Sequence, residues 1–231
     1  MEKLGFERFD ATAHWYPVAA SNEIQAGLIV QAFLDGQELA LWRSSDGELH
    51  AWENRCPHRG TRFTLGRIVG DTLICAYHGW KFAPQGQCLT IPANPTLTPP
   101  KSACAKTFSV REDQGMVWVT LSDAPWSPLD LGRAARSFCR GFVLYRAPEE
   151  VRVSLLNQVD QKYEDRGHAV LASGTDGGES TLLFLQPMAS DRTVAYLWAD
   201  TPPSGDSRMQ TLKRATSAFK TLRNQIELVA Q

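Results

Sequence analysis

The segments CPHRG (residues 56–60) and CAYHGW (residues 75–80) carry the most specific pattern in this 231-residue sequence. Each segment combines one cysteine with one histidine: Cys56 with His58, and Cys75 with His78. Sixteen residues separate His58 from Cys75. This spacing fits two neighbouring hairpin tips of one small domain.

The sequence around these segments predicts an antiparallel β domain. Between Trp15 and Leu121, short apolar runs alternate with turn signals, and no long helix-period stretch interrupts them. The dipeptides Asp35-Gly36 and Asp46-Gly47 are typical of tight hairpin turns. Strands are expected at residues 27–33, 37–43, 49–53, 72–76 and 116–121.

Two thiolates and two imidazoles on two loops predict a Rieske-type [2Fe–2S] cluster. In such a centre the cysteines hold one iron and the histidines hold the other. We therefore expect Cys56, His58, Cys75 and His78 to bind the cluster. Tetrahedral zinc is the alternative, because zinc also accepts two Cys and two His ligands. Structural zinc motifs usually open with two cysteines about two to four residues apart, whereas each segment here mixes the two residue types.

The composition predicts no nucleic-acid partner and no membrane span. The 24 Lys and Arg residues against 25 Asp and Glu residues leave a formal net charge of −1, which argues against binding to a polyanion. We find no signal peptide and no long apolar run, so a cytoplasmic location is expected. An odd number of cysteines, five, fits a reducing compartment. Cys88, Cys104 and Cys139 are expected to be buried or idle thiols.

The sequence becomes less regular after a turn-rich connector at residues 124–128. We expect a domain boundary there, with the cluster domain at residues 1–124 and a second domain at residues 125–231. The fold class expected for the whole chain is α+β. In the second domain we expect a strand at 150–156, a helix at 157–170, a Gly-rich loop at 174–180, a hairpin of strands 181–188 and 193–199, and an amphipathic helix at 207–229.

The first domain resembles the Rieske domain of the non-haem iron oxygenases that hydroxylate or demethylate aromatic compounds. The resemblance covers roughly residues 10 to 125. It is carried by residues 14–19, 41–43, 56–66, 75–82, 91–93 and 115–119. Membership of this family implies a second, catalytic domain of helix-grip type with a mononuclear iron held by two histidines and one carboxylate. Because that part of the sequence is short here, we expect a reduced remnant of it.

The motif for the mononuclear iron is incomplete in this sequence. The family pattern is N-x-x-D-x-x-H-x-x-x-x-H, followed far downstream by a carboxylate. Asn157, Asp160 and His168 match it, but Tyr163 stands at the first histidine and Asn224 at the carboxylate. Ferrous iron in such sites needs two imidazoles and a carboxylate. We therefore expect no mononuclear iron and assign no catalytic residue.

Alternative roles remain for residues near this motif. Glu164 or Asp165 could supply a carboxylate to an unorthodox iron site. In the oxygenases that the chain resembles, the aspartate matching Asp160 bridges a cluster histidine and an iron histidine across a subunit contact and helps to carry the electron. For Asp160 itself we expect an interface hydrogen bond, with the electron-carrying bridge as the alternative. Arg59 of the first segment and Arg62 just after it are expected to be solvated, with docking of an acidic redox partner as the alternative.

Three functions follow from this interpretation. The first is an electron-transfer or auxiliary subunit of a heteromeric Rieske oxygenase, which works with a catalytic subunit and a reductase or ferredoxin in a trimeric or hetero-oligomeric ring. The second is a self-sufficient oxygenase with iron near Tyr163, Asp165 and His168. The third is a structural or regulatory subunit whose cluster is not used in turnover.

Overall fold

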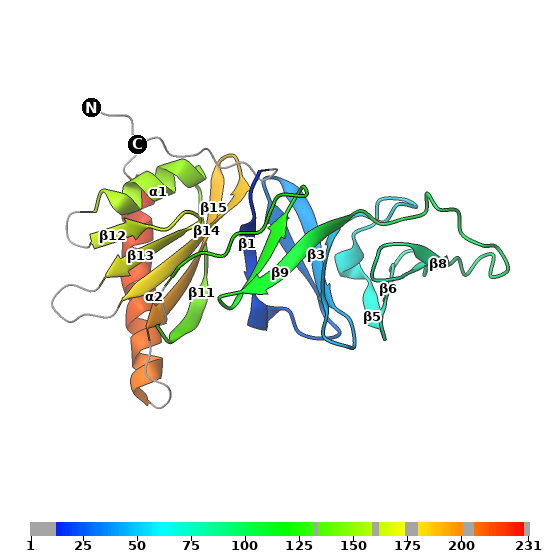
Figure 1. The fold of residues 1–231 in the computed structure, drawn as a ribbon, viewed down its shortest axis with the longest axis horizontal. Coiled ribbons are helices and arrows are strands. Elements are labelled where there is room, and N and C mark those ends of the chain that lie inside the picture. The colour runs from blue at the N-terminus through cyan, green and yellow to red at the C-terminus, as the bar shows by residue number, and fades with distance from the viewer. Residues whose placement is uncertain (1–12, 132–133, 159–161, 174–179, 201–205, 229–231) are drawn as a thin grey trace. The chain divides into compact units, whose positions relative to one another are not determined.

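The computed structural model describes residues 13–131, 134–158, 162–173, 180–200 and 206–228. They belong to two compact units, one within Ala11–Pro125 and the other from Trp126 onward. Each unit has its own antiparallel sheet and its own apolar core (Figure 1). The expected α+β class is therefore confirmed.

The first unit is built on a six-stranded sheet in the order β1-β10-β9-β4-β3-β2. The turn expected between β2 and β3 is confirmed, because Asp35 and Gly36 have φ angles of 49° and 79°, and two positive φ angles define the tight turn that suits twisted strands. A 3₁₀ helix, η1 (Ser21–Glu23), follows β1. The strands are β1 (Tyr16–Ala20), β2 (Ile29–Leu34), β3 (Gln37–Arg43), β4 (Leu49–Glu53), β9 (Thr107–Asp113) and β10 (Met116–Thr120).

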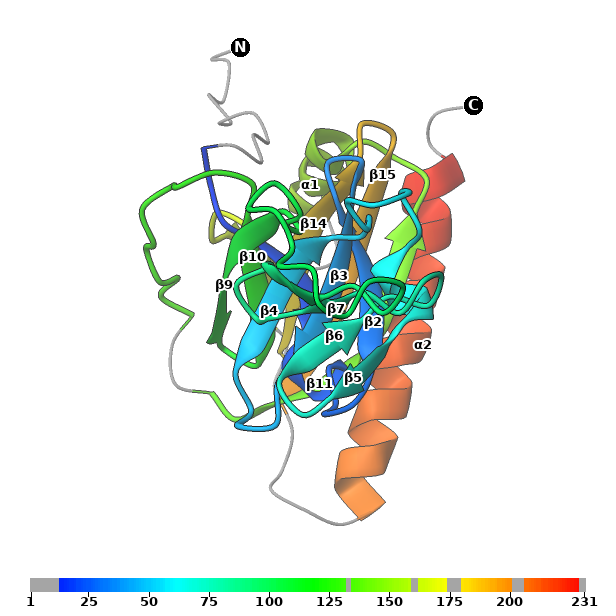
Figure 2. The ribbon, with the colours of Figure 1, turned by 90° about the vertical axis from the view of Figure 1, so that its right-hand side faces the viewer.

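A second, four-stranded sheet in the order β5-β6-β7-β8 carries the two Cys-His segments. In Figure 2, β5, β6 and β7 of this sheet lie side by side. Residues 56–60 precede the 3₁₀ helix η2 (Phe63–Leu65), and residues 75–80 connect β6 to β7. The strand expected at 72–76 ends at Ile74, because Cys75 already belongs to the turn. The strands are β5 (Arg67–Val69), β6 (Thr72–Ile74), β7 (Lys81–Phe82) and β8 (Cys88–Thr90).

An aromatic cluster forms the core beneath the two segments. The Trp52 ring meets the rings of Trp42, Phe63 and Phe82 edge to face, at centroid distances of 5.2, 5.3 and 6.2 Å. All four side chains are fully buried, and edge-to-face pairs of this kind add to the stabilisation from burial. This core supports the Cys-His segments from below.

The second unit has one five-stranded antiparallel sheet in the order β11-β15-β14-β13-β12, which α2 (Asp206–Leu228) contacts through β11 and β15. The expected hairpin and C-terminal helix are confirmed by β14, β15 and α2. Most of the expected Gly-rich loop lies outside the described residues. No described helix is long and apolar enough to span a membrane. The strands are β11 (Arg136–Leu144), β12 (Lys162–Asp165), β13 (Ala169–Ser173), β14 (Thr181–Ala189) and β15 (Arg192–Asp200).

The strand expected at residues 150–156 is wrong, because these residues belong to the helix α1 (Pro148–Leu156). The alternation of Val151, Val153 and Leu155 had favoured a strand. Pro148 at the first helical turn and acidic residues after it favour a helix start instead. Burial follows the helical period, since Val151 and Leu155 are fully buried while Val153 is 38% exposed.

The helix expected at residues 157–170 is also wrong. Residues 162–165 form β12, which pairs antiparallel with β13. Between them Gly167 has a φ of +78°, and the Arg166 N–H donates to the Ala169 carbonyl oxygen at 2.9 Å. A glycine-containing tight turn therefore reverses the chain where a continuous helix was expected.

Candidate metal centre

The two Cys-His loops have the same backbone turn. In the first loop, the Cys56 N–H donates to the Thr61 carbonyl oxygen (2.8 Å), and the Gly60 N–H donates to the Cys56 carbonyl oxygen (2.8 Å). The Cys75 and Gly79 N–H groups make the equivalent bonds in the second loop, at 3.0 and 3.1 Å. Both glycines have positive φ angles, +72° and +69°, which explains why glycine occupies these positions. The two loops therefore present equivalent positions to one another.

The two thiols lie beneath the surface and contact each other. Cys56 and Cys75 are each 3% exposed, and their side chains are within hydrogen-bonding reach. The backbone N–H groups of His58 and Arg59 also point at the Cys56 sulfur. Burial raises the pKa of the Cys56 thiol to about 12, and the neighbouring Cys75 thiol adds to this effect. At neutral pH the Cys56 thiol therefore becomes a thiolate when a metal cation binds it.

The two imidazoles lie at the surface. His58 is half-buried and His78 is exposed, and their Nδ1 atoms are 3.1 Å apart. The His58 ring stacks on Trp80 with centroids 4.4 Å apart and planes 9° from parallel, and the His78 ring lies 3.8 Å from the Tyr77 ring. Slight burial and the charges of His78 and Arg59 lower the pKa of His58. The neutral imidazole, which is the form that binds metal, is therefore favoured.

This arrangement fits a centre with two different irons. Like ligands are adjacent, thiol beside thiol and Nδ1 beside Nδ1, as a Rieske-type cluster requires. The aromatic rings of Tyr77 and Trp80 hold the imidazole planes, and backbone amides face a sulfur. Such outer contacts orient ligands and tune a metal site.

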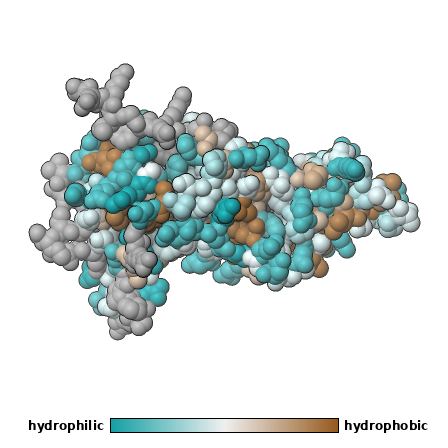
Figure 3. Space-filling model, viewed as in Figure 1, coloured by the Kyte–Doolittle hydropathy of each residue, from teal (hydrophilic) through white to brown (hydrophobic). Residues whose placement is uncertain are grey.

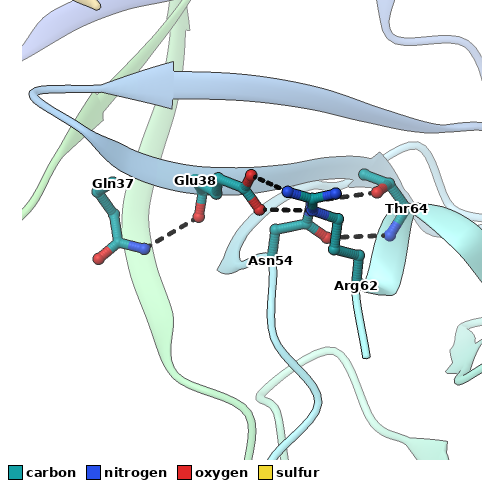
Figure 4. Close-up of polar contacts among 5 residues, drawn as sticks. All are labelled: Gln37, Glu38, Asn54, Arg62 and Thr64. Carbon is teal, nitrogen blue, oxygen red and sulfur yellow. Dashed lines mark hydrogen bonds and ion pairs between the residues drawn. The ribbon is translucent and has the colours of Figure 1, made fainter. Parts of the chain in front are cut away.

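Polar side chains on both sides of the first loop close its base (Figure 4). The Arg62 guanidinium donates to both carboxylate oxygens of Glu38, at 2.7 and 2.9 Å. The buried Asn54 amide donates to the Thr64 hydroxyl oxygen at 3.1 Å and accepts the Thr64 N–H at 3.0 Å. In addition, the Asn54 N–H donates to the Glu38 carbonyl oxygen at 3.0 Å. We call these four residues the loop clamp.

Sequence reasoning missed the loop clamp. Arg62 had been considered as solvated or as part of a docking surface, but its ion pair with Glu38 gives it a structural role. A polar Asn54 two residues before a buried cysteine was the one available signal. Its partner, ten residues along the chain, was not apparent from spacing alone.

The comparison with known families agrees with this geometry. The family model of the Rieske [2Fe–2S] domain matches residues 14–109. Residues 14–109 are a Rieske domain. The Rieske-type [2Fe–2S] cluster is therefore the cofactor of this family, and the zinc alternative is set aside.

The relatives of the Rieske domain include oxygenase components. The chain is 43% identical over 118 residues to the oxidoreductase NdmD of Pseudomonas putida, which covers 51% of this chain and 20% of that protein. It is 38% identical over 109 residues to the iron-sulfur subunit TsaM1 of the toluene-4-sulfonate monooxygenase system of Comamonas testosteroni, which covers 47% of this chain and 31% of that subunit. The chain thus spans less than a third of the length of these relatives.

The fold resembles that of solved oxygenases over nearly the whole chain. The crystal structure of apo dicamba monooxygenase superposes with a TM-score of 0.77 at 17% identity, covering 95% of this chain and 86% of that one. At this identity the likeness shows the fold alone. Together with the Rieske domain and its relatives, it confirms the resemblance to Rieske non-haem iron oxygenases.

The described residues that align with the mononuclear iron motif lie on different parts of the second unit. Asn157 caps the end of α1, and Asp160 lies outside the described residues. Tyr163 is half-buried in β12, and burial raises the pKa of its phenol to about 12. His168 follows the turn between β12 and β13, and Asn224 is exposed on α2.

The two carboxylates near Tyr163 are engaged in ion pairs. The Arg152 guanidinium donates to Asp165, with its Nε at 3.0 Å from a carboxylate oxygen, and the Gly167 N–H also donates to Asp165 at 3.0 Å. Arg166 pairs with Glu164 at 2.9 Å. Through these contacts the carboxylate oxygens join α1 to the end of β12 and stabilise the turn that follows β12.

The remaining cysteines are not paired with each other. None of the five cysteines, all of which lie within the described residues, forms a disulfide. Cys88 is buried in the core of the Rieske unit, Cys104 is exposed and Cys139 is half-buried.

Proposed function

We propose that this chain is an electron-transferring, auxiliary subunit of a heteromeric Rieske oxygenase. In this proposal residues 1–124 are the Rieske domain, in which Cys56 and Cys75 would hold one iron of the cluster and His58 and His78 the other. When bound, the cluster supplies one-electron transfer. The observation that carries the proposal is the arrangement of buried thiols beneath paired surface imidazoles. A ligand edge at the surface supports exchange of electrons with another protein.

We further propose that residues 125–231, a shortened catalytic-like domain, hold no mononuclear iron. Tyr163 stands where the first iron histidine is expected, and a phenol whose pKa is raised to about 12 stays protonated at neutral pH. Protonated phenol is a weak ligand for ferrous iron, which prefers imidazole and carboxylate. The ion pairs of Glu164 and Asp165 support the same proposal, because an iron would have to displace arginines from them.

The partners follow from the names of the relatives. One relative is called an iron-sulfur subunit of a monooxygenase system, and another is an N-alkylformylase oxygenase component. We infer that this chain works in the cytoplasm with a catalytic Rieske oxygenase subunit and with a reductase or ferredoxin. Assembly in a trimeric or hetero-oligomeric ring would bring its cluster near the iron of a neighbour.

A self-sufficient oxygenase is the second candidate function. It is favoured by the likeness to dicamba monooxygenase, whose fold covers 95% of this chain. This candidate requires a third iron in each chain, in addition to the two of the cluster. The regulatory alternative differs from both, because it requires no electron flow through the cluster.

Metal analysis of the purified chain and of its complex with a catalytic subunit separates these functions. We expect two irons and two acid-labile sulfides per chain, a Rieske EPR signal after reduction, and no oxygen uptake by the chain alone. About three irons per chain would overturn the proposal.

Matched histidine variants test the use of the cluster. His78→Ala should abolish oxygen uptake by the complex, whereas His168→Ala should leave it unchanged, because His168 lies outside the proposed electron path. If the complex with His78→Ala, shown by EPR to lack the cluster, keeps its activity, the subunit is regulatory. If His168→Ala abolishes activity, the chain has its own iron site.

A further inference from the structure

The part of the Rieske unit that carries the small sheet is basic, although the whole chain is not. Residues 55–101 contain six Lys or Arg residues and one Asp, a formal charge of +5. The rest of this unit, residues 13–54 and 102–125, contains three Lys or Arg residues and nine Asp or Glu residues, a formal charge of −6. The unit therefore has one strongly basic segment and a strongly acidic remainder. The net charge of −1 for the whole chain does not reveal this separation of charge.

The outer face of the small sheet combines basic and apolar side chains. Strand alternation turns Ile68 of β5, Phe82 of β7 and Cys88 of β8 into the core, so their neighbours point outward. These outward residues are Arg67, Val69, Lys81 and Leu89, and we call them the basic face.

The side chains of the basic face are accessible to solvent, and its two positive charges have no carboxylate partner among the residues that the structure describes. Val69 and Leu89 are 53% and 50% exposed, and Arg67 and Lys81 are exposed as well. Within the described residues, no Asp or Glu oxygen lies within ion-pair distance of Arg67 or Lys81. Figure 3 shows apolar (brown) atoms among hydrophilic (teal) ones over the end of this unit that carries the small sheet, at the right of the view.

The basic face adjoins the paired imidazoles. Lys81 follows His78 by three residues, so their backbones are at most about 11 Å apart. Tyr77, 63% exposed, lies against the His78 ring. Leu65 and Leu97 add two further exposed apolar side chains in the same basic segment, 67% and 48% exposed. A protein that covers the basic face would therefore lie beside the exposed ligand edge.

We propose that the basic face docks an acidic electron-carrying protein, whose carboxylates meet Arg67 and Lys81 and whose apolar side chains meet Val69 and Leu89. The proposal rests on the proposed function. In the encounter the reduced carrier would give up one electron to the bound cluster, with no bond formed or broken. As an acidic carrier approaches, it is attracted by the basic face and repelled by the acidic remainder of the unit. These two forces orient the unit so that the basic face meets the carrier, as in other electrostatically steered associations.

A nucleic acid fits these observations less well than a compact acidic protein. Nucleic acids bind through several phosphate contacts along an extended polyanion. Here two unpaired cations lie between apolar residues, and the acidic remainder of the same unit repels an extended polyanion. A protein with a single acidic patch meets only the basic face.

Binding of a strongly acidic plant-type [2Fe–2S] ferredoxin to the cluster-loaded chain tests this proposal. The Kd should rise at least about tenfold between about 50 mM and 500 mM NaCl, because salt shortens the range of charge attraction. The double variant Arg67→Glu with Lys81→Glu should weaken binding at low salt by about tenfold or more. Lys213→Glu with Lys220→Glu, two exposed positions on α2, makes the same charge change and should bind as the native chain does.

Three outcomes would overturn the proposal that the basic face docks an acidic electron carrier. They are a Kd independent of salt, native binding by the double variant, and tighter binding of a short DNA duplex than of the ferredoxin. An unchanged EPR signal shows that the double variant retains its cluster. If this variant binds ferredoxin as the native chain does and turnover still depends on the cluster, docking at the basic face is rejected and the proposed function stands. If the double variant loses binding but turnover of the complex does not need the cluster, the docking role of the basic face stands and the proposed electron-transfer function is rejected.

Discussion

Asn54 stabilises the first ligand loop through two hydrogen bonds that cross its base. The side chain is fully buried, so water cannot replace a lost partner. Asn54 bonds to both the hydroxyl and the N–H of Thr64. These bonds fix the chain that precedes Cys56 and His58 relative to the chain that follows them. A single buried amide thus joins the two sides of the loop at its base.

Replacement of this amide should destabilise the chain. Asn54→Leu leaves the Thr64 N–H without its acceptor, and a buried unsatisfied donor costs about 1–3 kcal/mol. We expect a loss of this size in the free energy of unfolding from urea titration, and faster loss of the cluster's visible absorbance. Thr64→Ser, which keeps both bonds, should be close to native. Equal losses in the two variants would contradict the role of the amide.

The ion pair between Glu38 and Arg62 makes the loop clamp sensitive to acid. The hydrogen bond from Arg62 is the main cause that lowers the pKa of Glu38 below its ordinary value of 4.5. A lowered carboxyl pKa gives stability that is present above pH 4.5 and is lost as the pH falls through the folded-state pKa.

Glu38→Gln should therefore lower the melting temperature at pH 7, and the difference from the native chain should shrink below pH 4.5 and disappear once the pH lies below the lowered folded-state pKa. Thermal melts from pH 7 to pH 3 measure this difference. Glu48→Gln, which removes an exposed carboxylate of the same unit that has no ion pair within the described residues, is the control. A difference that stays constant across this pH range would show that the ion pair is not its cause.

At the scale of elements, the hairpin between β7 and β8 depends on a close backbone approach. The Ala105 N–H donates to the Gly86 carbonyl oxygen at 2.8 Å. A Cβ atom on Gly86 would lie 2.4 Å from the Ala105 carbonyl oxygen, and the φ of Gly86 is +88°. Glycine is therefore required here by both conformation and space.

Two alanine variants separate these causes. Gly47 has the same φ of +88° with no atom within 4 Å of an added Cβ, so Gly47→Ala should cost only the left-handed strain of about 1–2 kcal/mol. Gly86→Ala should cost about 2 kcal/mol more in urea titration, because backbone must move. Equal costs would mean that the hairpin adjusts freely.

The elements also show where local patterns mislead. The segment at 150–156 alternates like a strand, yet α1 forms because Pro148 and the following acidic residues start a helix. Residues 162–165 were expected in a helix, yet they pair with β13. At α1 a local start signal decides the structure, whereas at residues 162–165 pairing within the five-stranded sheet outweighs a weak local preference.

At the scale of the whole molecule, the two units have separate cores. One core contains Cys56 and Cys75, and the other packs α1 and α2 on the five-stranded sheet. Cluster binding contributes to folding only where its ligands lie. The two units should therefore respond differently to loss of metal.

Calorimetry should resolve two unfolding transitions. Removal of iron with a chelator under reducing conditions should lower the midpoint of one transition by several degrees and leave the other in place. Tryptophan fluorescence should follow mainly the transition that moves, because five of the seven tryptophans lie in the first unit. A single transition that shifts as a whole would show that the chain unfolds as one cooperative body.

Several features depend only on neighbours along the chain, and the sequence by itself determined them. They include the positive-φ turn at Asp35 and Gly36, the amphipathic helix α2, and the repeated Cys-His pattern with glycine four residues after each cysteine. Each follows from local backbone preference or from the period of apolar residues. The Rieske domain could therefore be predicted before any coordinates were known.

Tertiary structure decided the rest, because the interactions join residues that are distant in sequence. The ion pair from Glu38 to Arg62 spans 24 residues, and the outward direction of Arg67 and Lys81 depends on which strand face meets the core. Burial of Tyr163, and the arginine partners of Asp165 and Glu164, likewise depend on packing in the second unit. Local sequence encodes preferences for each segment, while packing selects among them by the free energy of burial and of paired charges.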